Sequence, residues 1–267
     1  MLRARALLGP LHYHPTTGWG PIRALVAMEV AAGVAALVAS SVWIATLLVG
    51  PTTTKSTPVP CTTSPSTGTT CFQVTVTSDV PVLACVLIFD LLVIAAAWRL
   101  ARRGGMRPAD VLALRAPLGG AKAALAIACV VAAFLAAEIA AMSYFPSASA
   151  QASRLMAELA AQGGWALAIL TIGIIGPLAE EIWLRGFLLS ALAKSPLGFW
   201  AAGVLVAVLF AVLHAAQYAL ILLVPIFMLG LVLAWALGVT GSLWVPIIVH
   251  VGNNLLALFA LWMQPPV

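Results

Sequence analysis

The residues of this 267-residue chain that could do chemistry are concentrated in its second half, within otherwise apolar stretches. Glu180 and Glu181 are adjacent, follow Pro177 closely, and precede Arg185. Neighbouring residues of a helix point about 100° apart, so the two carboxylates cannot share one direction. The i,i+4 spacing pairs Glu181 with Arg185 and leaves Glu180 without a local partner. A free carboxylate in apolar surroundings, one turn after a proline kink, has the properties of a general base.

Two histidines lie farther along the chain, in segments that are otherwise uncharged. No Asp, Glu, Lys or Arg follows Lys194, so His214 and His250 are the side chains there that can titrate near neutral pH. Phe210 precedes His214 by one helical turn, and Asn254 follows His250 by one turn. A lone histidine in a helix is usually a hydrogen-bonded core residue. Two of them after a glutamate pair predict instead a site in which these side chains and the free glutamate converge from three helices.

Three short motifs occur together and in a fixed order. They are Glu-Glu-x-x-x-Arg at 180–185, Phe-x-x-x-His at 210–214 and His-x-x-x-Asn at 250–254, with Gly-Ser-Leu-Trp at 241–244 before the third. In this set and order the chain resembles the type II CAAX prenyl endopeptidase family, which includes bacteriocin-processing and immunity proteins (the CPBP family). The resemblance covers about residues 110–263.

The resemblance implies an intramembrane endopeptidase that forms no covalent acyl-enzyme. By this resemblance Glu180 activates a water, aided by His214, and His250 and Asn254 stabilise the oxyanion. Glu181 and Arg185 would hold the helix and orient these groups, with Phe210 as a wall beside His214. The substrate would be a peptide or a membrane-associated protein.

Three alternatives stay open at this stage. Glu180, His214 and His250 could instead be three ligands of a catalytic zinc, although the metal-free glutamate mechanism is favoured because Asn254 is a poor zinc ligand. A membrane scaffold or bacteriocin-immunity protein could keep the same polar cluster without catalysis. A proton-coupled transporter fits less well, because the sequence contains no internal repeat.

Composition places the chain in a membrane. It is 63% hydrophobic and 8% charged, with a mean hydropathy of +1.10, whereas about a quarter of the residues of a soluble domain are charged. The net charge of +5 does not indicate nucleic-acid binding, because the basic residues lie between apolar segments. Most of them precede the first apolar segment or lie between the second and the third, which predicts a cytoplasmic N-terminus. The usage of Ala, Leu, Val and Arg indicates a GC-rich bacterium, and hence the bacterial cell membrane.

The apolar runs predict an all-α, polytopic bundle of about seven transmembrane helices, with the site among the C-terminal ones. The expected spans are residues 24–49, 80–101, 123–145, 164–193, 197–217, 219–238 and 243–263. Seven spans from a cytoplasmic start put the C-terminus outside. We expect residues 1–109 to form a tail, two helices and an exported loop, and residues 110–267 to form the catalytic domain.

Other features have mainly structural interpretations. Glu29 lies near a helix end, while Asp90 and Glu138 lie deeper and are expected to pair with neighbouring helices rather than act in catalysis.

The connecting segments also carry expectations. The Thr/Ser/Pro-rich segment 51–79 is expected to be unstructured, with a disulfide between Cys61 and Cys71. The segment 102–122 predicts either a short interfacial helix or a linker.

Overall fold

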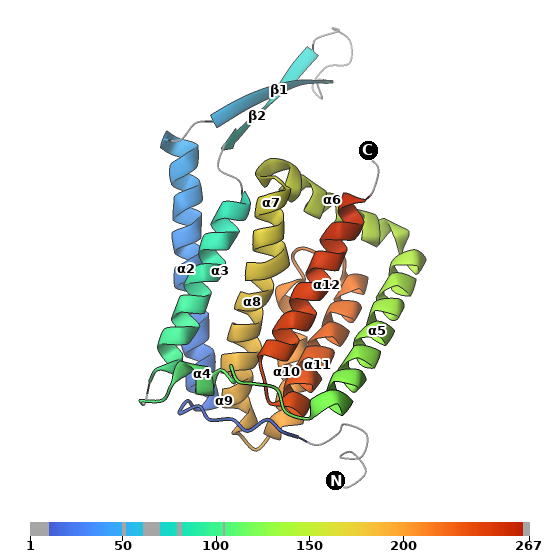
Figure 1. The fold of residues 1–267 in the computed structure, drawn as a ribbon. Helices are drawn as coiled ribbons and strands as arrows, with labels where there is room; N and C mark the ends of the chain where they lie inside the picture. Colours follow the sequence, from blue (N-terminus) through green and yellow to red (C-terminus); the bar gives the residue numbers. More distant parts are fainter. Residues whose placement is uncertain (1–10, 50–51, 61–69, 79–81, 104, 264–267) are drawn as a thin grey trace.

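Apolar helices that run side by side form most of the molecule (Figure 1). The computed structural model describes residues 11–49, 52–60, 70–78, 82–103 and 105–263. Within this part of the chain, six helical segments are long and apolar enough to cross a membrane: Pro21–Thr46, Val82–Ala101, Gly120–Tyr144, Trp165–Ala193, Leu220–Thr240 and Trp244–Trp262. The predicted all-α, polytopic bundle is therefore confirmed, with six such segments in place of the predicted seven.

The remaining predicted span is a shorter helix. Residues 197–217 were expected to cross the membrane, but α10 (Gly198–Leu213) has 16 residues and is about 24 Å long, less than the roughly 30 Å of a bilayer core. Its last turn tightens, because the N–H groups of His214 and Ala215 bond to carbonyls three residues back. The chain then turns through η3 (Leu220–Leu222) into α11 (Leu223–Thr240).

The first two helices pack along each other and are joined by a β-hairpin. α2 (Pro21–Val49) and α3 (Val82–Ala101) run antiparallel, with β1 (Thr52–Pro60) and β2 (Thr70–Ser78) between them (Figure 1). The two strands pair in an antiparallel register. The prediction that this connection is unstructured was wrong. Its alternating Val and Thr residues favour extended backbone, and the antiparallel helices bring the two strand ends together.

The predicted disulfide of this hairpin stays a prediction. Cys71 belongs to β2, whereas Cys61 lies in 61–69, outside the residues that the structure describes.

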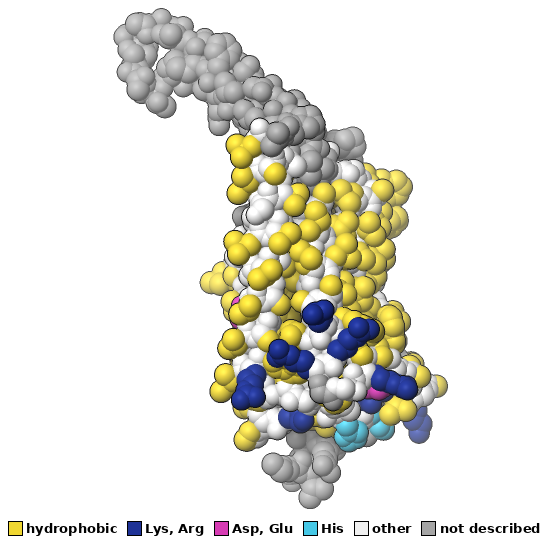
Figure 2. Space-filling model, turned by 90° about the vertical axis from the view of Figure 1, so that its left-hand side faces the viewer, with side chains coloured by type: hydrophobic (Ala, Val, Ile, Leu, Met, Phe, Trp, Pro, Cys, Tyr) yellow, Lys and Arg dark blue, Asp and Glu magenta, His cyan; other side chains and the backbone are white. Residues whose placement is uncertain are grey.

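One end of the bundle is closed by the N-terminal segment and by short connections. The backbone N–H of His12 donates to Gly238 O at 2.8 Å, and Lys194 Nζ donates to Thr17 O at 2.5 Å. Lys and Arg side chains gather around this end (Figure 2). Most of the described basic residues thus lie at one end, as the charge asymmetry predicts, with Lys55 and Arg154 as exceptions. The assignment of that end to the cytoplasm stays a prediction.

The segment 102–122 lies at this same end. It contains a single helical turn, α4 (Pro108–Val111), followed by the buried residues Leu112 and Ala113. Gly241, which ends α11, adopts a φ of +63°, and a Cβ there would lie 2.8 Å from His12 O, so this close turn favours glycine.

The opposite end carries a helix that the sequence analysis did not predict. α5 (Gly120–Tyr144) is followed at once by α6 (Pro146–Gly163), which lies across this end (Figure 1). Pro146 occupies the first turn of α6, where a missing N–H costs little. The last helix, α12 (Trp244–Trp262), ends on the same side.

The central helix, residues 165–193, changes its hydrogen-bonding register along its length. It consists of α7 (Trp165–Ala168), η1 (Ile169–Ile175), α8 (Gly176–Glu180), η2 (Glu181–Leu188) and α9 (Leu189–Ala193), of which η1 and η2 are π-helical. It packs against α3 and α12. Short π-helical insertions are rare and occur frequently at functional sites.

Candidate active site

The switch of register in the central helix separates the two glutamates. Pro177 is the second residue of α8, so the helix restarts there without a break in the chain's direction. Glu180 is the last residue of α8, and Glu181 is the first of η2. The side chain of Glu181 is fully buried, whereas 31% of that of Glu180 is exposed.

Glu181 forms the predicted ion pair with Arg185. Arg185 Nη1 donates to Glu181 Oε1 at 2.9 Å, and both side chains have no exposed surface. The guanidinium carbon lies 4.5 Å from the centre of the Phe210 ring, and Nη2 donates to Gly230 O at 3.4 Å. Removing two charges from water costs several kcal/mol per ion, and these contacts offset part of that cost. The pair ties the central helix to α10 and α11.

His250 from α12 is oriented by this ion pair. Its Nδ1 lies 3.0 Å from Glu181 Oε1, and the side chain is 3% exposed. A carboxylate paired with an arginine accepts hydrogen bonds, so Nδ1 is the donor. The other ring nitrogen, Nε2, lies 3.7 Å from Glu180 Oε2. The Phe210 ring meets the imidazole edge-on, with centres 5.5 Å apart.

His214 caps the C-terminus of α10 and is oriented by a backbone carbonyl. Its Nδ1 lies 2.8 Å from Phe210 O. Because a carbonyl oxygen only accepts, Nδ1 carries the proton. Nε2 then lies 3.8 Å from Glu180 Oε1, and 19% of the side chain is exposed. The Phe210 ring lies 4.7 Å from the imidazole and walls it, as the one-turn spacing predicts.

Glu180, His214 and His250 therefore converge from three helices. Each carboxylate oxygen of Glu180 faces one Nε2, at 3.8 Å and 3.7 Å. These distances exceed those of direct hydrogen bonds and suit a bridging water. The residues that follow His214 (215–217) are exposed in irregular backbone. Exposed, irregular backbone therefore adjoins the site at His214.

Asn254 contacts the central helix from α12. Its Nδ2 donates to Ile172 O in η1 at 2.9 Å. The acceptor fixes which end of the amide is the nitrogen. The amide keeps a second N–H.

Sequence reasoning missed Tyr218, whose ring lies 6.0 Å from that of His214. Its spacing of one helical turn after His214 was an available signal.

Asp90 on α3 is 6% exposed, and its Oδ2 has no hydrogen-bond partner among the described residues. A Cβ on Gly176 would lie 3.6 Å from that oxygen, so Asp90 lies against the start of α8. Glu138 is half-buried and Glu29 is exposed.

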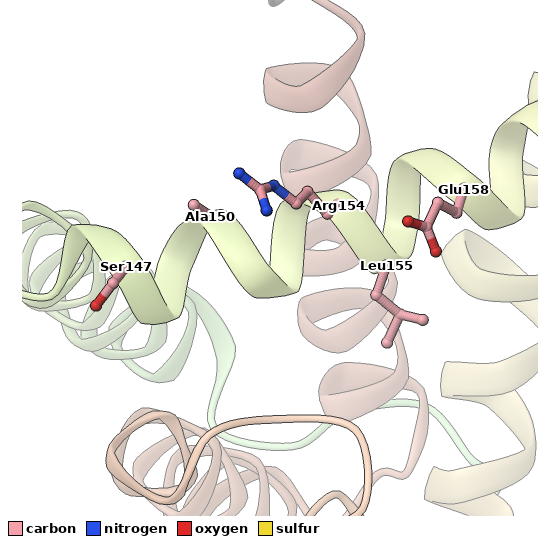
Figure 3. A pocket seen from close by; sticks show the side chains of 5 residues that line it. All are labelled: Ser147, Ala150, Arg154, Leu155 and Glu158. Carbon is pink, nitrogen blue, oxygen red and sulfur yellow. The ribbon is translucent and has the colours of Figure 1, made fainter. Parts of the chain in front are cut away.

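A surface hollow of about 460 Å³ lies along α6, apart from these residues (Figure 3). It is lined by Ser147, Ala150, Arg154, Leu155 and Glu158. None of them belongs to the predicted site.

The predicted zinc alternative concerns Glu180, His214 and His250. Among the residues that the structure describes, no group of three or more His, Cys, Asp and Glu side chains is arranged to hold a metal ion. The zinc alternative stays a prediction that metal analysis can test.

One comparison with known proteins matches the part of the chain that carries the three motifs. Residues 162–256 match the family model described as Type II CAAX prenyl endopeptidase Rce1-like. The matched range contains all three motifs, so the predicted resemblance is confirmed over these residues. Neither the comparison with curated proteins nor that with solved structures gave a match. The family match supports an intramembrane protease of the CAAX endopeptidase kind.

Proposed function

We propose that this chain, which contains a type II CAAX endopeptidase Rce1-like domain at residues 162–256, hydrolyses a peptide bond of a peptide or membrane-associated protein within the bilayer. Glu180 is the general base, His214 aids it, and His250 and Asn254 stabilise the oxyanion. The observation that carries this proposal is that each carboxylate oxygen of Glu180 faces one Nε2, while each Nδ1 is fixed by an acceptor.

The partners of the two Nδ1 atoms support different roles for the two histidines. His214 donates to the neutral carbonyl of Phe210, so in the neutral ring Nε2 carries a lone pair. That lone pair can accept a hydrogen bond from a water that also donates to Glu180. His214 thereby orients the nucleophile.

His250 donates to a carboxylate instead of a carbonyl. With its proton on Nδ1, the ring can present an N–H at Nε2 only as an imidazolium. His250 is then a donor to the oxyanion, together with the second N–H of Asn254, and preorganised donors of this kind contribute about 3 kcal/mol each.

The reaction needs no covalent enzyme intermediate. The water oxygen attacks the carbonyl carbon while Glu180 takes the proton, and the carbonyl oxygen becomes the oxyanion. When the C–N bond breaks, Glu180 returns the proton to the departing amine. Glu181 and Arg185 position His250.

The proposal predicts that Glu180→Gln, His214→Ala and His250→Ala each lower cleavage by at least about 100-fold, because each removes a proton acceptor or oxyanion donor. Cleavage is measured with purified protein in detergent micelles and a library of quenched-fluorescent apolar peptides. Glu158→Gln is the matched control, since Glu158 is exposed on α6, and it should retain full activity. Full activity in all three site variants would contradict the proposal.

The substrate can be sought in cells by comparing the membrane peptidome of cells that carry the native protein with that of cells that carry Glu180→Gln. A biological phenotype that survives Glu180→Gln would indicate a scaffold or immunity protein instead. Metal analysis of purified active protein tests the zinc alternative separately.

A further inference from the structure

The central helix contains a carbonyl that its own backbone does not satisfy. At the end of η1 the N–H of Gly176 bonds to Thr171 O, five residues back. The next residue is Pro177, which has no N–H. In the same register, an N–H at position 177 would donate to the carbonyl of Ile172, five residues back. That carbonyl instead accepts the side-chain N–H of Asn254 at 2.9 Å.

The contact between η1 and α12 is close enough to hold this arrangement. A Cβ on Gly173 would lie 2.7 Å from Cδ2 of Leu255, the residue after Asn254. The lack of a side chain at Gly173 thus lets α12 approach the helix beside Ile172. The half-buried carbonyl and amide both have hydrogen-bonding partners in this way, which polar groups shielded from water require.

We propose that Pro177 is a positioning residue for Asn254: by removing one backbone N–H, it frees Ile172 O to fix the amide that donates to the oxyanion. This inference rests on the proposed function for its catalytic consequence, whereas the positioning itself does not depend on it. Pro177 acts only through Asn254 and touches no reacting atom.

The test restores the missing N–H with Pro177→Ala. The new donor competes with Asn254 for Ile172 O, so the amide should change its hydrogen bonding. This is measured without any substrate, as a shift of the ¹⁵N side-chain amide signal of Asn254, assigned by its loss in Asn254→Ala. Pro225→Ala is the matched control, because Pro225 lies in the first turn of α11, where the N–H has no partner within the helix. It should leave the signal unchanged.

The catalytic readout uses the same quenched-fluorescent peptide library. Pro177→Ala should lower kcat by about 10-fold to about 100-fold, the scale of a small misplacement of a catalytic group, with little change in KM. The melting temperature should not fall, because an alanine restores a helical hydrogen bond. In an Asn254→Ala background the same change should have little further effect on kcat. A merely structural role of Pro177 would lower stability and would act independently of Asn254.

Two results would overturn the inference. One is an Asn254 amide signal that is the same in Pro177→Ala as in the native protein. The other is an unchanged kcat in Pro177→Ala when Glu180→Gln abolishes cleavage. If the native protein cleaves no peptide, the proposed function fails, and the amide signal still decides the inference. Pro177→Gly, which also supplies the N–H, replaces Pro177→Ala if that variant does not accumulate.

Discussion

At the scale of single residues, the site depends on two adjacent glutamates in opposite environments. Glu181 is sealed in the bundle with Arg185, whereas Glu180 is partly exposed and faces two imidazoles. Glu181 Oε1 also contacts His250 Nδ1. One carboxylate therefore neutralises a buried cation and orients the His250 ring, which leaves Glu180 for its proposed role as the general base.

The buried pair makes a prediction about stability. Arg185→Met should lower the free energy of unfolding by about 3–5 kcal/mol, because it leaves the Glu181 charge buried without its partner. The double change Glu181→Gln with Arg185→Met should recover most of this loss. Unfolding is followed by denaturant titration in detergent, with Arg154→Met on exposed α6 as the control. Additive losses in the double variant would show that the two side chains do not depend on each other.

At the scale of elements, the sequence predicted helices wherever a long apolar run was present, because length and hydropathy suffice to identify a span. It did not predict where α10 ends, since residues 214–219 contain no proline or glycine to mark the end of a helix. It also missed α6, whose polar and apolar residues alternate at helical spacing outside any long apolar run. The hairpin was missed because its Thr- and Ser-rich composition is shared with disordered segments.

The site was more predictable than the helix that carries it. The i,i+4 spacing of Glu181 and Arg185 predicted their ion pair, and Phe210 walls His214 as its spacing indicated. The π-helical register of η1 and η2 could not be predicted, because helical periodicity assumes 3.6 residues per turn. Pro177 was the local sign of a change in that register. The contact of Asn254 with Ile172 O follows from that register and was therefore missed.

The contact between α10 and α11 has no room for an added methyl group at Gly230. A Cβ on Gly230 would lie 2.9 Å from Ala207 Cβ and 3.0 Å from Ala207 Cα, so the two helices must separate to admit it. Gly230→Ala should therefore lower the free energy of unfolding by about 1–3 kcal/mol. It should also reduce cleavage, because α10 carries Phe210 and His214. Gly33→Ala, on α2 with open space around the glycine, is the control. Unchanged stability in Gly230→Ala would indicate that this interface is loosely packed.

At the scale of the whole molecule, charge and architecture make one prediction about orientation. Arg99 in the last turn of α3, with Arg102 and Arg103 after it, lies at the end that the N-terminal segment closes, while the hairpin and α6 lie at the other (Figure 1). Because basic connections stay in the cytoplasm, α6 and the end of α12 should face outside. A cytoplasmic N-terminus would then close the basic end.

Cysteine accessibility tests this orientation directly. In a background with all four native cysteines changed to serine, Ser147→Cys on α6 should react with a membrane-impermeant maleimide in intact cells. Arg103→Cys should react only after the membrane is permeabilised, since both positions are exposed and differ only in the end at which they lie. The reverse labelling pattern would mean that the basic end faces outside, contrary to the positive-inside rule. The intramembrane site would remain, but its products would then be expected on the other side of the bilayer.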